Sequence, residues 1–262
     1  MIDRYISNEI NSIWNDQNRF NTWKLVQEKF VETLEQLNIA EVGVAEKIRK
    51  AEVTKDEVYK REEITNHDLA SFVDILQEKV GEGSNWIHYG LTSSDVVDTA
   101  NSMLILQSIG IVEESINNLL SILQKRAIQE KDTVIIGRTH GVYAEETFLG
   151  NIFGNWHLEI QRSLNRIENS KNNIAIGKLS GPVGNHSVVS EEMEKLTLEK
   201  LDLAPEKFAN QIVSRDRYAE VISALGILAS TYERIATNIR SYQRSEISEM
   251  FEAFKEGQKG SS

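Results

Sequence analysis

The stretch RDRYAEVISALGILASTYERIATNIRSYQRSEISEMF, residues 215–251, decides the fold class. Its apolar side chains recur at steps of three and four, the spacing that places them on one face of an α-helix. They are Tyr218, Val221, Ile222, Leu225, Leu228, Ala229, Tyr232, Ile235, Ala236, Ile239 and Tyr242. A helix of about 36 residues would be about 54 Å long at ~1.5 Å per residue. So long and broad an apolar face predicts packing against other long helices, part of it in other subunits.

Two earlier stretches have the same helical spacing. Residues 94–130, with a weak point near Gly110, and residues 146–174 complete a set of three long helices. Such helices pack at shallow angles in a bundle. Shorter helices are expected over 6–39, 54–63, 67–80 and 190–201.

We therefore expect an all-α fold made of a small N-terminal helical domain, residues 1–93, and part of a long-helix bundle, residues 94–262. The β-branched run at 133–136 and the glycines between 177 and 184 add short β segments or loops near 133–146 and 175–184. Only two prolines interrupt the chain, which favours long helices over a loop-rich β fold.

Composition excludes several classes of protein. The chain of 262 residues carries 29 Lys and Arg against 40 Asp and Glu, a net charge of −11, which argues against a nucleic-acid binder with a basic face. The absence of cysteine excludes disulfides and thiolate catalysis. No apolar run reaches the ~20 residues of a membrane span, and the first residues lack the layout of a signal peptide. We expect a cytoplasmic protein.

Two segments carry residues suited to chemistry. His140 lies between Gly137 and Gly141 beside Arg138 and Thr139, where glycine allows a ligand to approach the backbone, arginine binds anions and histidine exchanges protons. The segment TSSD, residues 92–95, places hydroxyls where they would cap the next helix or, with its free N–H groups, bind an anion. From local chemistry alone, a structural role for each segment stays open. No zinc, P-loop or dinucleotide-binding spacing is present.

Several ordered segments resemble the adenylosuccinate lyase family of the fumarase/aspartase superfamily. The matching segments are MIDRY at 1–5, TNHD at 65–68, WIHYGLTSSDVVDTA at 86–100, GRTHGV at 137–142, Gln211 with RDR at 215–217, and GQKGSS at 257–262. Asn66 and Tyr143 stand where this branch usually has other residues.

The resemblance implies a reaction, the β-elimination of fumarate from adenylosuccinate, giving AMP, and from SAICAR, giving AICAR, in purine nucleotide biosynthesis. Ser261 would be the base that removes the Cβ proton, and His140 the general acid that protonates the departing nitrogen. The remaining implied residues bind substrate: Thr92, Ser93 and Gln211 its carboxylates, His67 and Asp68 its body with His88 nearby, and Arg4 and Tyr5 its phosphate. No metal or organic cofactor is implied.

Members of the resembling family continue beyond the mobile loop that begins at Ser261. We therefore expect this chain to be an N-terminal portion without the C-terminal domain, with little turnover alone. The resemblance also implies a homo-oligomer, a tetramer in the family, whose active sites are shared between subunits. Its only expected ligand is a small purine nucleotide, with no nucleic acid or membrane partner.

Two alternatives remain open from the sequence. Another lyase of the superfamily, such as argininosuccinate lyase, has the same layout of segments. A non-catalytic helical assembly fragment would keep the bundle and lose the chemistry, although it would have no need of the combined histidines and hydroxyls.

Overall fold

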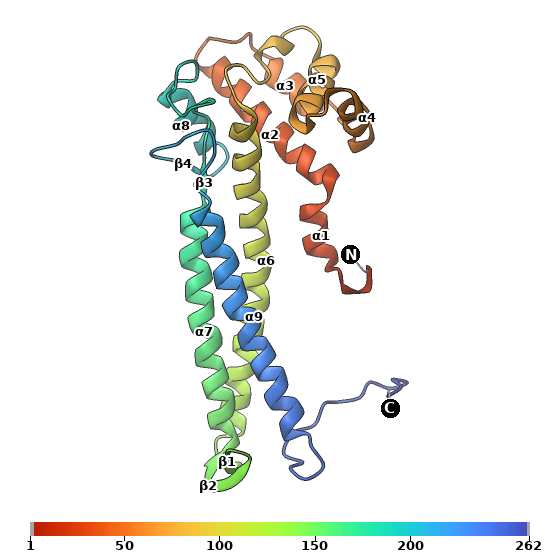
Figure 1. Ribbon diagram of the computed structural model, residues 1–262, viewed down its shortest axis with the longest axis vertical. Coiled ribbons are helices and arrows are strands. Elements are labelled where there is room, and N and C mark those ends of the chain that lie inside the picture. The colour runs from red at the N-terminus through yellow and green to blue at the C-terminus, as the bar shows by residue number, and fades with distance from the viewer. Residues whose placement is uncertain (1–2, 261–262) are drawn as a thin grey trace. The chain divides into compact units, whose positions relative to one another are not determined.

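The computed structural model describes residues 3–260 and confirms the all-α class (Figure 1). The chain groups into two compact units. Unit 1 contains the described residues through Val112 together with Ser170–Ala219, and unit 2 contains Glu113–Asn169 together with the described residues from Glu220 onward. The expected domain boundary between residues 93 and 94 stays a prediction.

Unit 1 begins with short helices. They are η1 (Asp3–Tyr5), α1 (Asn8–Trp14), α2 (Asp16–Gln36), α3 (Val44–Lys50), α4 (Lys55–Thr65), α5 (Asp68–Val80) and η2 (Ser84–Trp86). The prediction of one helix over 6–39 is wrong, because Asn15 breaks it. The Asn15 side chain accepts a hydrogen bond from the N–H of Asn18 at 2.9 Å and so begins a second helix. The short helix α3 was not predicted.

The boundaries of α4 follow from its end residues. Thr54 and Glu57 form a reciprocal capping box at its start. Asn66 ends it with φ of 52°, a left-handed conformation that asparagine tolerates better than most residues. Asparagine at this position therefore has a structural reason.

Aromatic side chains form the centre of the unit 1 core. The rings of Phe20, Trp23 and Phe72 are almost completely buried and lie 5.2–6.1 Å apart, mostly edge to face. Such pairs add to the free energy gained by burying apolar area. They connect α2 to α5, so the two helices that precede the candidate site are held together.

The three long helices are α6 (Ser93–Gln129), α7 (Leu149–Ile174) and α9 (Asp216–Tyr242), all drawn in Figure 1. Helix α6 continues through Gly110 without a break. Helix α9 ends at Tyr242, so its predicted extension to residue 251 is wrong. The next two positions on its apolar face are Ser245 and Glu246, and the N–H groups of Glu249 and Met250 turn back to the carbonyl of Tyr242.

A two-stranded antiparallel hairpin in unit 2 confirms the β segment near 133–146. It consists of β1 (Val134–Thr139) and β2 (Val142–Phe148). Its two turn residues, His140 and Gly141, have φ of 55° and 75°, as a type I′ turn requires. Because β2 extends to Phe148, α7 begins at Leu149 and not at residue 146.

The second β segment, near 175–184, is a short parallel pair in unit 1. Strand β3 (Ile176–Gly177) pairs with β4 (Ala204–Pro205). Helix α8 (Glu191–Glu199) lies between them in the sequence, as predicted for 190–201. The pair closes the loop 178–203 onto unit 1.

Polar bonds join the helices of unit 2. The Nδ1 of His157 on α7 donates to the carbonyl of Leu120 on α6 at 3.1 Å, a structural role. Glu159 on α7 accepts from the hydroxyl of Thr231 at 2.9 Å and pairs with Arg234, both on α9.

Within residues 3–260, no helix is long and apolar enough to cross a membrane.

We predict that Phe72→Ala destabilises the chain by about 3–5 kcal/mol, because it leaves a cavity among three buried rings. Phe208→Ala is the matched control, since that ring is 97% exposed and its loss should change stability by less than about 0.5 kcal/mol. Urea unfolding measures both. Equal losses of stability in the two variants would contradict the prediction that the buried aromatic cluster stabilises unit 1.

Candidate active site

Two of the predicted site residues, His67 and Ser93, meet in unit 1. His67 caps α5, and its Nδ1 accepts a hydrogen bond from the N–H of Ala70 at 3.3 Å. The Nε2 of the same ring lies 3.3 Å from the hydroxyl of Ser93 at the start of α6. Because Nδ1 accepts, the ring proton of the neutral form is on Nε2 and is donated to Ser93. Asp68 follows and accepts from the N–H of Leu69 at 2.7 Å.

The start of α6 is organised by Asp95 and not by the hydroxyls. The carboxylate of Asp95 accepts from the N–H of Thr92 at 2.9 Å. The expectation that a hydroxyl of this segment caps the helix is wrong for Thr92, whose hydroxyl makes no hydrogen bond to any residue in 3–260. That hydroxyl is therefore free to bind a ligand.

Asp95 is also half of a buried ion pair. Its carboxylate contacts the ammonium of Lys178, and both side chains are fully buried. The ammonium donates to the carbonyl of Gly181 at 2.8 Å, and the N–H of Gly181 donates to Asp95 at 3.1 Å. Burial raises the pKa of Asp95, and Lys178 with the N–H groups of Thr92 and Gly181 opposes that rise. The network fixes the Thr92 segment against the loop that follows β3.

A second carboxylate anchors the segment that contains Gln211. Asp98, one turn after Asp95, accepts from the N–H of Val213 at 2.8 Å and pairs with Arg215 at 3.1 Å. Gln211 itself is exposed. The structure thus holds the chain two residues from Gln211 against α6, and within residues 3–260 Gln211 makes no hydrogen bond to another predicted residue.

His88 belongs to the same region of unit 1. Its ring is mostly buried, and this desolvation lowers its pKa to about 4, with a smaller contribution from the nearby His67. The side chain of Gln27 on α2 contacts both its backbone and its ring. At neutral pH His88 is therefore uncharged.

The remaining predicted residues lie in unit 2, at the start of unit 1, or outside the described residues. His140 is exposed at the tip of the β1–β2 hairpin in unit 2, so its meeting with the unit 1 residues stays a prediction. Arg4 and Tyr5 are exposed in η1, where the guanidinium lies 5.2 Å from the ring centre. Ser261 lies outside the described residues.

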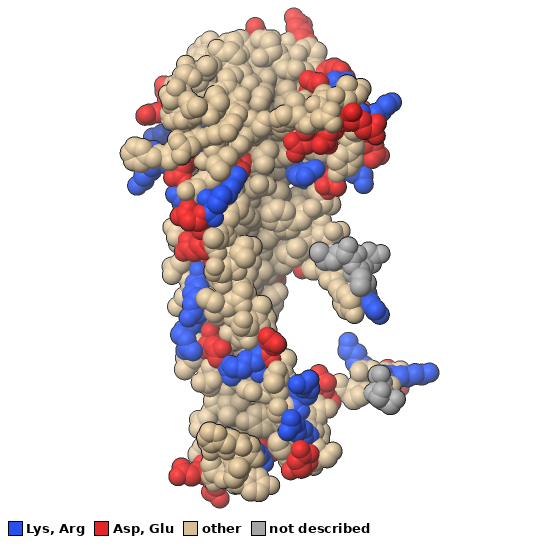
Figure 2. Space-filling view, in the orientation of Figure 1, with Lys and Arg blue, Asp and Glu red and all other residues tan. Residues whose placement is uncertain are grey.

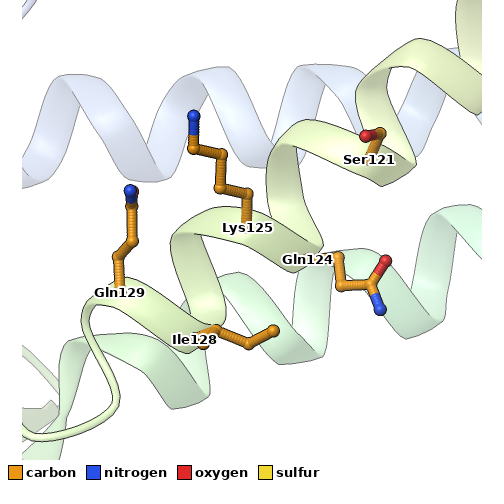
Figure 3. A pocket seen from close by; sticks show the side chains of 5 residues that line it. All are labelled: Ser121, Gln124, Lys125, Ile128 and Gln129. Carbon is orange, nitrogen blue, oxygen red and sulfur yellow. The ribbon is translucent and has the colours of Figure 1, made fainter.

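On the face drawn in Figure 2, acidic and basic side chains are interspersed and no broad basic patch is visible. A shallow hollow of about 350 Å³ in unit 2 is lined by Ser121, Gln124, Lys125, Ile128 and Gln129. All five belong to α6 and do not converge on a common point (Figure 3). None of the predicted site residues lines it.

Sequence reasoning missed three residues that support the site, namely Gln27, Asp95 and Lys178. Gln27 and Lys178 have a signal in the sequence. Gln27 lies four residues after Trp23 on the apolar face of α2, and Lys178 is a single charge within the buried run Ile176–Ser180. A lone polar residue in an apolar pattern indicates a buried partner.

Lys178→Met should destabilise the chain by about 3–5 kcal/mol, because it leaves the Asp95 carboxylate buried without its cation. The double variant with Asp95→Asn should recover part of this loss, since no buried charge then remains. Lys50→Met, at a side chain that is 76% exposed, is the matched control. Urea unfolding of the four chains is the measurement, and a loss no larger than that of the control would contradict the prediction.

Comparison with known proteins agrees with these observations. The sequence model of the Lyase family matches residues 7–262. Adenylosuccinate lyase from Thermotoga maritima is 40% identical over 263 residues, covering 100% of this chain and 61% of that protein. The adenylosuccinate lyase of Helicobacter pylori strain 26695 is 38% identical, with 100% and 60% covered. The chain thus spans about three fifths of the length of these curated relatives.

Solved structures show the same fold. A fumarate lyase from Mesorhizobium sp. BNC1 superposes with a TM-score of 0.87 at 19% identity, over 92% of this chain and 58% of that one. A 3-carboxy-cis,cis-muconate lactonizing enzyme from Pseudomonas putida gives 0.88 at 18% identity, over 95% and 59%. With the family match over nearly the whole sequence, the chain belongs to the Lyase family.

Proposed function

We propose that this chain is part of an adenylosuccinate lyase, which eliminates fumarate from adenylosuccinate and from SAICAR. The observation that carries the proposal is the contact between His67 and Ser93 at the start of α6, next in sequence to Thr92 and near the neutral His88. Relatives of that name, about 40% identical over the whole chain, support it.

The local chemistry suits a dicarboxylate. Thr92 and Ser93 offer hydroxyls, and the first turn of α6 offers N–H groups at the positive end of a helix dipole. His67 donates its Nε2 proton to Ser93, which leaves the Ser93 proton free for a carboxylate oxygen. In the proposed reaction, negative charge builds up on a carboxylate of the substrate, and clustered donors stabilise that charge.

The proposed catalytic groups act with these donors. His140, on a hairpin tip, would protonate the departing nitrogen, and Ser261 would remove the Cβ proton. Gln211 would bind a carboxylate, Asp68 would orient the substrate, and Arg4 with Tyr5 would contact its phosphate. We place the reaction in the cytoplasm.

A lyase of the same superfamily with another substrate is the second candidate. The TM-scores of 0.87 and 0.88 with a fumarate lyase and a lactonizing enzyme favour the shared fold but not one substrate. The substrate must therefore be tested directly.

We expect adenylosuccinate to raise the stability of the chain more than argininosuccinate does in a thermal-shift titration. A ligand at 100 times its Kd stabilises by about 2.7 kcal/mol.

Thr92→Val should weaken adenylosuccinate binding at least about tenfold, because a bond to a carboxylate is worth about 1.5–3 kcal/mol. Thr133→Val, whose hydroxyl bonds only Glu130 in the described chain, should leave binding unchanged. Stronger stabilisation by argininosuccinate would favour the second candidate.

We also propose that the chain forms a homo-oligomer, a tetramer in the whole enzyme. Helix α9 buries Val221, Ala224 and Leu228, whereas Ile222 on the same helix is 68% exposed. Ile227 and Tyr232 are also exposed. Apolar side chains of this size on one helix indicate a surface that another copy covers.

Sedimentation at micromolar concentration should therefore show self-association, and Ile222→Asp should shift the chain towards smaller species, because it places a charge in the covered surface. Glu233→Asp, at an exposed position of the same helix, should not. A monomer at this concentration would contradict the proposal.

A further inference from the structure

Gln27 is a fully buried amide in the middle of α2. Its neighbours along the helix, Trp23, Val26 and Phe30, are core residues. Burying an amide among apolar side chains is unfavourable unless its hydrogen bonds are satisfied. The bonds that satisfy Gln27 both lead to one residue, His88.

The direction of these two bonds follows from the chemistry of the groups. The backbone N–H of His88 lies 2.9 Å from Gln27 Oε1, and since a backbone N–H only donates, that atom of the amide must be the oxygen. The amide nitrogen therefore faces His88 Nδ1, at 3.0 Å. Because an amide NH₂ group only donates, Nδ1 must be the unprotonated nitrogen of the ring.

The other ring nitrogen, Nε2, then carries the proton of the neutral imidazole. No residue in 3–260 forms a hydrogen bond with it. His88 also has a backbone φ of 63°, a left-handed conformation that is uncommon for residues other than glycine, although histidine adopts it more often than most. Gln27 thus contacts both the backbone N–H and the ring of His88, and so holds the residue at two points.

We propose that Gln27 is a positioning residue, whose amide holds His88 as the neutral Nε2–H tautomer and so makes His88 a hydrogen-bond donor to the bound substrate. In this role His88 binds an acceptor atom, a carboxylate oxygen or a ring nitrogen, and does not itself take or give the proton of the reaction. Only the identity of the substrate rests on the proposed function; the tautomer does not.

The tautomer can be read by NMR of the whole chain labelled with ¹⁵N-histidine, near pH 7. His88→Asn, which removes one set of ring signals, identifies those of His88. The expected result is a pyridine-type shift for Nδ1 and a pyrrole-type shift for Nε2. A protonated Nδ1 in the unaltered chain would overturn the proposal.

Gln27→Glu keeps nearly the same side-chain shape but replaces the amide donor that faces His88 Nδ1 with an acceptor. A carboxylate accepts from Nδ1, so Nδ1 should become protonated, either in the Nδ1–H tautomer or in the imidazolium. Gln27→Met, which adds no charge, should leave a mixture of tautomers. Thr33→Val is the matched control on α2, because its buried hydroxyl bonds only Lys29 in the described chain, and it should leave the His88 signals unchanged.

An Nδ1 that stays unprotonated in Gln27→Glu once the new carboxyl is ionised, or a single unchanged tautomer in Gln27→Met, would overturn the proposal. A titration with adenylosuccinate separates this result from the proposed function. If the ring signals follow the expected pattern while adenylosuccinate leaves Nε2 unmoved, the substrate is wrong and the positioning role stands. A downfield shift of the Nε2 proton on titration in the unaltered chain, lost in Gln27→Glu, supports both.

Discussion

A fully buried ion pair between Lys178 and Asp95 connects the start of α6 to the loop after β3. A buried charge without a partner is strongly unfavourable, so each side chain requires the other. The same carboxylate binds the N–H groups of Thr92 and Gly181, and therefore one interaction sets the position of two backbone segments. One turn later the buried carboxylate of Asp98 binds the N–H of Val213 in the same way and pairs with the half-exposed Arg215.

This anchoring explains why the hydroxyls at the start of α6 are available. In most helices a threonine or serine at this place is used to cap the first turn. Here Asp95 binds the Thr92 N–H, and Ser93 is oriented by His67 from α5. The helix start therefore has hydrogen-bond donors that make no bond within the fold, as a site for a dicarboxylate requires.

The sequence predicted the long helices because their apolar spacing persists over many turns, and it located a β segment near 133–146 from its β-branched residues. The predicted helix boundaries were wrong where one or two side chains decide them. Asn15 starts α2, and Ser245 with Glu246 ends the apolar face of α9. The supporting residues of the site were missed for a related reason. Gln27 and Lys178 act through partners 61 and 83 residues away, and spacing along the chain does not reveal such pairs.

Unit 1 is assembled from two separate parts of the chain, and this affects its biosynthesis. Lys178 is made 83 residues after Asp95, and Val213 is made 115 residues after Asp98. At a translation rate of roughly 5–20 residues per second, the ribosome adds Lys178 about 4–17 s after it adds Asp95. Until then Asp95 must stay hydrated, so the nascent chain holds the first turn of α6 open to water, and chaperones have that interval in which to bind it.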